Sequence, residues 1–382
     1  MHRLSRSPVV LSVLIAVFAS ICFPRALFAW DDHRRVTRLS LESIESGTVL
    51  PSAVFETLES ALPAMQSGAT REEFANRLGI RGEKVDWNWA AGEEKPLSAV
   101  EVLSWSAQEP DNGMDQDLDL GPDQKYMGGA AGPSSQGIRH MYFPKWDWRR
   151  PLATFHFPVR AMGMAPERAQ LCLDLALRAA AGGHRFWSYR FLGWGLHYVE
   201  DMGQPYHASE FASVRLLPLF TLFRGWEAFI AETTRRVGNF HLAFEYLTDF
   251  LLDRGDAVEQ AFRVPDADAA FKRALEGSAD QPVKEAVLRL AEVSNALAPE
   301  LAAAESTLMG KILLDRNMEL IPGFTDAQGK PKIDFKAVLA DGASAASMPP
   351  STKKFFKTMN VALSNTGVAA RWYVNAFILR SR

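Results

Sequence analysis

A short segment between His197 and His207 combines two histidines and an acid at a spacing that suits metal binding. It reads HYVEDMGQPYH. Residues i and i+4 of a helix lie on the same face, so His197 and Asp201 would point at one place. The helix is expected to end near Pro205, which lets His207 turn back toward that place.

A second i,i+4 pair follows, because His241 and Glu245 occur together in HLAFE. Two such pairs and a shared extra histidine indicate a site for several metal ions. Mixed imidazole and carboxylate ligands suit zinc, and catalytic zinc sites leave one position open for water. Beyond the N-terminal leader the only cysteine is Cys172, so a structural zinc site built from cysteines is excluded.

Three more residues are candidate ligands by type and context: His33 near the start, Asp111 in EPDNG, and His140 in HMYFP. His156 lies between two phenylalanines and His184 follows a glycine pair, and neither has a partner pattern. We therefore expect His156 to pack in the core and His184 to have a structural or surface role.

Asp115, Asp117 and Asp119 alternate in GMDQDLDLG and could suggest a calcium loop. The complete calcium-loop pattern, with its closing glutamate, is missing. We therefore expect a solvated acidic loop here.

The order of these elements resembles the zinc-dependent phospholipase C family, which shares its fold with the single-strand-specific zinc nucleases. The resemblance covers about residues 30–252. The matching elements, in chain order, are Trp30 with His33, Pro110 with Asp111, HMYFP from His140, the His197–Asp201–His207 element, and the His241–Glu245 pair.

The chain also departs from the family pattern. The gap from Trp30 to His33 is short, and Glu200 occupies a position where the family usually has a small residue. The stretches 111–140 and 207–241 are long.

The resemblance implies three zinc ions. The implied ligands are Asp111, His140, His197 and Asp201 for the first ion, His207, His241 and Glu245 for the second, and the amine and carbonyl of Trp30 with His33 and a bridging Asp201 for the third. A backbone amine binds metal only when it is free and deprotonated, so the third site would require cleavage before Trp30. The resemblance also makes Asp111 the candidate to orient the attacking water or take its proton.

Zinc lowers the pKa of a bound water and polarises phosphoryl oxygens, and clustered cations attract a phosphodiester. We therefore expect hydrolysis of a phosphodiester by metal-activated water. VRLLPLFTLF (214–223) is nearly all apolar; a core helix is the default interpretation, but Pro218 interrupts it, and an apolar patch there would suit a lipid surface. The aromatic segment YFPKWDW (142–148) could contact lipid in the same way, or stack on bases.

Three functional hypotheses follow. The first is a phospholipase C that cleaves glycerophospholipid head groups, with peripheral membrane contact and no stable nucleic-acid complex. The second is a single-strand-specific nuclease and 3′-nucleotidase with the same three zinc ions. The third is a metal-binding protein without catalysis.

The first 29 residues are typical of a signal peptide. Arg3 and Arg6 precede an apolar run at 9–23, and a cleavage site follows Ala29. An uncleaved anchor is the alternative, although the run is short for a bilayer span. Cleavage would make the protein secreted or periplasmic, and loss of Arg3, Arg6 and Arg25 would change the formal charge from −3 to −6. This charge argues against polyanion binding driven by net charge.

The elements that must position these residues are mainly helical, and strand patterns are scarce. We expect helices near 32–45, 52–64, 70–79, 166–181, 185–203, 224–252, 281–316 and 353–380. Residues 110–160 are rich in Gly, Pro, Asp and aromatics, which predicts a long functional loop, and 320–352 predicts a surface excursion.

The sequence therefore predicts one all-α domain over residues 30–382, similar to the phospholipase C and zinc nuclease fold, with long loops that carry ligands. A C-terminal helical extension is expected from about residue 253. No histidine follows Leu252, so this extension should supply scaffold rather than metal ligands.

Overall fold

The computed structural model describes most of the chain. The described residues are 32–47, 50–115, 135–150, 152, 156, 159–255, 257–264, 275, 282–315, 333–339 and 349–382. The predicted signal peptide, Trp30, Asp117 and Asp119 lie outside the described residues.

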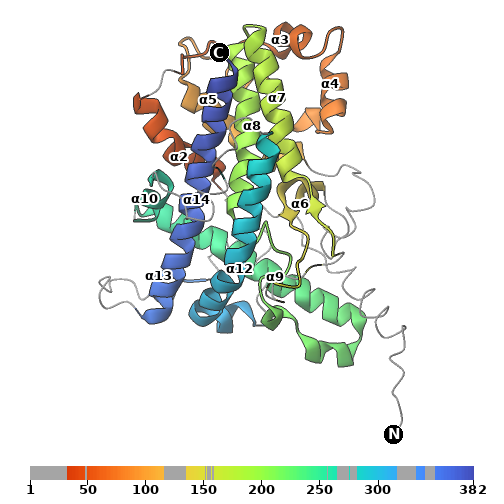
Figure 1. Cartoon of the computed structure of the whole chain (residues 1–382), viewed down its shortest axis with the longest axis vertical. Helices are drawn as coiled ribbons and strands as arrows, with labels where there is room; N and C mark the ends of the chain where they lie inside the picture. The colour runs from red at the N-terminus through yellow and green to blue at the C-terminus, as the bar shows by residue number, and fades with distance from the viewer. Residues whose placement is uncertain are drawn as a thin grey trace.

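The described residues are mainly helical, which confirms the predicted all-α class (Figure 1). The α-helices are α2 (His33–Gly47), α3 (Leu58–Met65), α4 (Arg71–Leu78), α5 (Ala99–Ala107), α6 (Ser135–His140), α7 (Ala165–Ala181), α8 (Arg185–Gly203), α9 (Trp226–Asp253), α10 (Ala257–Arg263), α12 (Val283–Leu313), α13 (Phe335–Val338) and α14 (Pro350–Arg380). Short helical turns are η1 (Gly82–Lys84), η2 (Pro110–Met114), η5 (Val214–Leu216) and η6 (Leu219–Arg224). The strands β1 (Tyr142–Phe143) and β2 (Met162–Gly163) pair antiparallel.

Helix α8 lies at the centre of the fold. Apolar and aromatic residues occur on all its sides, as expected for a helix that is surrounded by protein, and every residue from Phe186 to Gly203 is buried. It packs against α5, α7, α12 and α14, and Figure 1 shows α7, α8, α12 and α14 side by side along the long axis. Glycine permits close contact here: a Cβ on Gly203 would lie 1.9 Å from Oγ1 of Thr366 in α14.

The helices after residue 253 complete the hydrophobic core. One buried cluster joins α3, α4, α5, α7 and α8 to the C-terminal half of α14. A second joins α9, α10, α12 and α13 to the N-terminal half of α14. None of the described helices is both long enough and apolar enough to cross a bilayer.

Two local features differ from the predictions. Helix α5 was not predicted, although Ser98 and Glu101 form a reciprocal capping box at its start. The helix expected from residue 52 begins only at Leu58, because the preceding residues are extended and Ala53 pairs with Leu97.

Candidate metal centre

All the predicted ligands except Trp30 lie close together around the C-terminal half of α8, and none is more than 2 % exposed. Six separate segments contribute them: His33 begins α2, Asp111 lies in η2, His140 ends α6, His197 and Asp201 lie in α8, His207 follows α8, and His241 and Glu245 lie in α9. The position of Trp30 is not among the described residues.

Three groups of side chains have ligand atoms close enough together to hold a metal ion. The groups are His140, His197 and Asp201; His207, His241 and Glu245; and His33, Asp111 and His197. The second group has the membership predicted for the second ion. Asp111, predicted for the first ion, approaches both His140 and His197 of the first group and His33.

Asp201 lies at the junction of these groups. Its Oδ2 is 3.2 Å from Nδ1 of His140 and 3.3 Å from Nε2 of His197. Its Oδ1 is 3.3 Å from Nδ1 of His207 and 3.7 Å from Nε2 of His33. No hydrogen bond from the described residues reaches either oxygen. One carboxylate surrounded by four imidazoles is well placed to bridge two metal ions.

His241 and Glu245 of α9 lie next to His207. The Nε2 atoms of His207 and His241 are 2.9 Å apart, and Nε2 of His241 is 2.6 Å from Oε1 of Glu245. The i,i+4 spacing on one helix brings His241 and Glu245 together, as the sequence predicts. The amide of Gln204 donates to the same Glu245 oxygen at 3.0 Å, which fixes the carboxylate.

Asp111 lies between His33 and His140. Its Oδ1 is 3.4 Å from Nδ1 of His140, and its Oδ2 is 3.8 Å from Nε2 of His33. Residue Gly113 of the same turn has a φ of 95°, a conformation that glycine adopts without strain. The irregular turn η2 thus carries Asp111 into the interior immediately after α5.

Four of these histidines also have an outer polar partner at a ring nitrogen. For His33, His140 and His197 this nitrogen faces away from the neighbouring ligands, whereas Nδ1 of His207 also lies near Asp201. The partners are Glu200 for His33 (2.7 Å), Asp115 for His140 (3.3 Å), the carbonyl of Ala107 for His197 (2.7 Å) and the carbonyl of His140 for His207 (2.9 Å). Metal-binding histidines generally have such outer partners, which fix the tautomer and the ring orientation.

The prediction of a solvated acidic loop was wrong for Asp115, which is fully buried. Arg139 and Arg168 donate to its Oδ1, and the hydroxyl of Tyr198 donates to its Oδ2. Burial favours the neutral acid, but the neighbouring Arg168 and His140 hold the pKa of Asp115 far below its usual value. The residue is therefore a buried anion directly behind His140.

Glu200, which departs from the family pattern and was not predicted to belong to the site, is also buried. Its Oε2 lies 2.7 Å from Nδ1 of His33, and its Oε1 accepts a hydrogen bond of 2.7 Å from Thr37. Burial raises the pKa of Glu200, although His33 and Thr37 act against this rise.

The carboxylates of the cluster favour positive charge on the neighbouring histidines. Burial lowers the pKa of His140, but the carboxylates of Asp201 and Asp115 outweigh it and raise the pKa to about 10. Burial likewise lowers the pKa of His207, but Asp201 and Glu245 raise it to about 9. Burial raises the pKa of Asp201, yet the surrounding histidines hold it well below its usual value.

These residues fit a metal ion. Tetrahedral zinc with Zn–N bonds of about 2.0–2.1 Å separates its nitrogen ligands by about 3.3 Å. The facing nitrogens of His140 and His197 are 2.8 Å apart, so a small outward movement of the rings suffices. Nε2 of His33 and both oxygens of Asp201 are buried without a hydrogen bond from the described residues, which is unfavourable unless a cation binds them.

The two remaining described histidines lie elsewhere. His156 is buried, and its Nε2 lies 3.0 Å from the carbonyl of Arg160. His184 precedes α8, and its Nδ1 lies 2.7 Å from Glu56. Neither belongs to the metal-binding groups.

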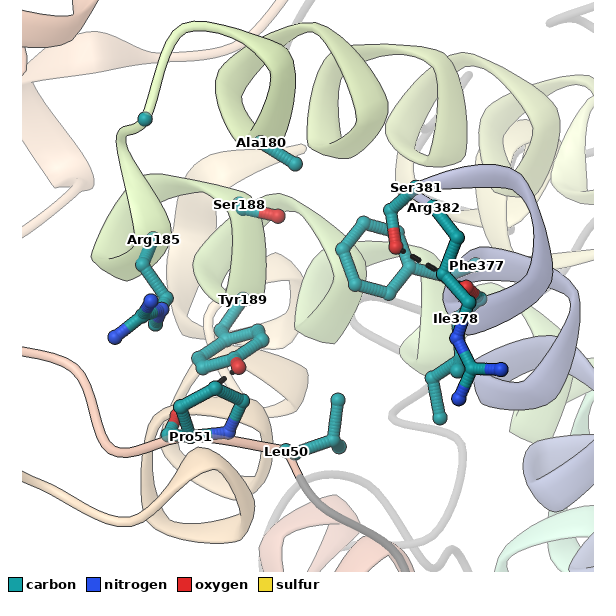
Figure 2. A pocket seen from close by; sticks show the side chains of 11 residues that line it. Leu50, Pro51, Ala180, Arg185, Ser188, Tyr189, Phe377, Ile378, Ser381 and Arg382 are labelled. Carbon is teal, nitrogen blue, oxygen red and sulfur yellow. Dashed lines mark hydrogen bonds between the residues drawn. The ribbon is translucent and has the colours of Figure 1, made fainter.

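A surface pocket of about 300 Å³ lies away from this centre (Figure 2). It is formed where the N-terminal part of α8 meets the end of α14, and Pro51, Tyr189 and Phe377 line it. Tyr189 and His197 are separated by about 12 Å along the axis of α8 at 1.5 Å per residue. None of the candidate ligands lines this pocket.

No family model, curated protein or solved structure that was compared with this chain matches it.

Proposed function

We propose that this protein is a zinc-dependent phosphodiester hydrolase of the phospholipase C type. The observation that supports this proposal most directly is the buried group of five histidines around Asp201, with Asp111 and Glu245 beside them. Burying so many ionisable groups costs free energy unless bound cations compensate them. The order of these residues along the chain gives independent support through the resemblance to the zinc-dependent phospholipase C family.

In this proposal Asp111, His140, His197 and Asp201 hold the first zinc ion, and His207, His241 and Glu245 hold the second. His33, the amine and carbonyl of Trp30 and a bridging Asp201 hold the third, after a protease has freed that amine.

When bound, zinc would supply a Lewis acid for the phosphoryl oxygens and a water of lowered pKa. The residues of the chain supply the geometry. Asp111 is placed to orient the attacking water or to accept its proton, and as a weak base it contributes mainly orientation. Asp115 and Glu200 hold the rings of His140 and His33 in place.

A lipid substrate is favoured over a nucleic acid by the surface between two ligand-bearing segments. Leu219, Phe220 and Phe223 are exposed there. Trp148 is also exposed and could stack on a base, so a single-strand-specific nuclease with 3′-nucleotidase activity remains the second candidate.

Zinc counting and substrate assays on the exported protein test the proposal together. We expect N-terminal sequencing to find Trp30 first, metal analysis to find three zinc ions per chain, and lecithin micelles to be hydrolysed faster than single-stranded DNA or 3′-nucleotides. Faster turnover of nucleic acid would favour the nuclease. Zinc binding without hydrolysis of any phosphodiester would overturn both enzymatic functions and favour a metal-binding protein without catalysis.

A further inference from the structure

Exposed apolar side chains cluster in the segment that leads from the turn after α8 to α9. Of the twelve large apolar side chains exposed in the described chain, five fall within residues 214–223, and the others are spread over six further regions. The five, here called the apolar patch, are Val214, Leu219, Phe220, Leu222 and Phe223. Exposed apolar side chains gathered in one segment in this way are typical of an interaction site.

The local structure holds the patch outward. Residues i and i+3 of a 3₁₀ helix lie on the same side, so Phe220 and Phe223 of η6 project together, at 87 % and 90 % exposure. Thr221 faces the interior, where its amide and hydroxyl both donate to the carbonyl of Pro218 at 2.7 Å. The two phenyl rings are thus displayed by a hydrogen-bonded turn.

Positive charge lies at both ends of the patch. Arg215 and Arg224 are exposed, and Glu227 is the first exposed acid after them. Apolar side chains with a cationic border are complementary to a bilayer that contains anionic phospholipids. A second copy of this chain docked on the patch would, by contrast, place its own Arg215 and Arg224 against those of the first copy, so like charges would meet.

We infer that the apolar patch docks the protein on bilayers that contain anionic phospholipids. The inference rests on the proposed function, because a hydrolase of lipid head groups must reach its substrate at a bilayer. The patch is an anchor separate from the reacting groups: η6 packs on the start of α9, and Trp226 is about 22 Å along the helix axis from His241. In Figure 1, α9 lies toward the opposite end of the molecule from the C-terminus.

Vesicle flotation of the zinc-loaded protein tests this docking. The vesicles contain phosphatidylcholine alone or mixed with phosphatidylglycerol. We expect the double variant Phe220→Ser/Phe223→Ser to reduce vesicle binding about tenfold or more, because two apolar rings no longer enter the interface. Arg215→Gln/Arg224→Gln should weaken binding to the mixed vesicles only. Leu379→Ser, which changes an exposed side chain at the end of α14, is the matched control and should bind like the wild type.

Hydrolysis of a soluble substrate, p-nitrophenyl phosphocholine, is measured on the same samples and should be equal in all of them. Docking is overturned if the wild type does not float with either vesicle, or if the phenylalanine double variant floats equally well. It is also overturned if the wild type is a dimer that the phenylalanine substitutions dissociate, since a second copy would then cover the patch. Flotation without hydrolysis of any phosphodiester would overturn the proposed function and leave docking intact.

Discussion

Asp201 lies at the centre of the candidate metal site, where four histidine rings face its two oxygens. Asp201→Asn preserves its shape and removes this charge. We expect the variant to lose at least one zinc ion and to reduce hydrolysis by about 100-fold or more, since both metal affinity and the placement of the ions depend on this carboxylate. Metal analysis and soluble-substrate kinetics measure these effects. Asp174→Asn, at an exposed position of α7, is the control; full zinc content in Asp201→Asn would contradict the bridging role.

Glu200 is placed to act on the candidate metal centre through His33, whose Nδ1 lies 2.7 Å from its Oε2. Glu200→Ala removes the only side chain found within hydrogen-bond distance of Nδ1 of His33 among the described residues. Loss of such an outer partner typically lowers metal affinity by about 10–100-fold, so we expect a chelator of correspondingly lower affinity to remove one zinc ion. Competition with a chromogenic chelator measures the change. Glu59→Ala, an exposed change in α3, should have no effect, and an unchanged affinity in Glu200→Ala would refute the positioning role.

The histidine pKa values predict a pH dependence of zinc binding. His140 and His207, with pKa values of about 10 and about 9, are protonated in the zinc-free protein at neutral pH. Zinc binds only the neutral imidazole, so binding should release about two protons from this pair. Affinity should therefore rise with pH through the neutral range and level off above these pKa values. Zinc titration in a weakly buffered indicator solution measures the released protons, and constant affinity between acid and neutral pH would disprove the prediction.

Contacts within one helix were easier to predict from the sequence than contacts between residues that are far apart in the chain. The i,i+4 spacings identified the pairs on α8 and α9, because helical geometry alone brings such residues together. Asp115 was misinterpreted, since its burial depends on Arg139 and Arg168, which are distant in sequence. Its position four residues after Asp111 was the available signal, although the irregular turn η2 weakens any inference from helical spacing there.

At the scale of elements, the close contact between α8 and α14 keeps Asp201 in place. Gly203→Ala would place a Cβ 1.9 Å from Oγ1 and 3.1 Å from Cα of Thr366, so one of the two helices must move. We expect the free energy of unfolding to fall by about 1–3 kcal/mol, as is usual for overpacking. Urea denaturation of the zinc-loaded protein measures this loss.

Gly310→Ala in α12 is the matched control with the opposite sign. Its new Cβ would meet only the Cβ of Ser306, at an ordinary distance of 3.6 Å. Alanine favours a helix interior over glycine by up to about 1 kcal/mol, so this variant should be slightly more stable than the wild type. If both variants change stability in the same direction, the tight contact at Gly203 is not the cause.

Long helices were predicted more closely than short ones: the short helix near 70–79 is present as α4, but α5 was not predicted. The expected helices near 166–181 and 185–203 match α7 and α8 within one residue, because each has a long periodic or uniformly apolar sequence. In the segment 214–223, the apolar composition favoured a core helix, whereas Pro218 argued against one. The structure resolves it as two 3₁₀ turns that expose side chains rather than as a core helix.

At the scale of the whole molecule, the candidate metal centre takes its ligands from both hydrophobic clusters, which α2, α12 and α14 also join by packing. His197 and Asp201 belong to α8 in the first cluster, while His241 and Glu245 belong to α9 in the second. The N-terminal helix α2 contributes His33 to the same site. Bound ions should therefore stabilise the arrangement of both clusters together.

Removal of zinc should then destabilise the entire fold. An ion present at about a thousand times its dissociation constant stabilises the folded state by about 4 kcal/mol. With an unfolding entropy of about 2.1 cal/mol/K per residue, a chain of this length changes Tm by about 1–2 °C per kcal/mol, so loss of one such ion should lower Tm by on the order of 5 °C. Calorimetry with and without a chelator measures the shift, and added zinc but not magnesium should restore it, because imidazole ligands disfavour magnesium. A shift confined to α2 in hydrogen exchange, with Tm unchanged, would show that the ions organise only the N-terminal helix and that packing alone joins the two clusters.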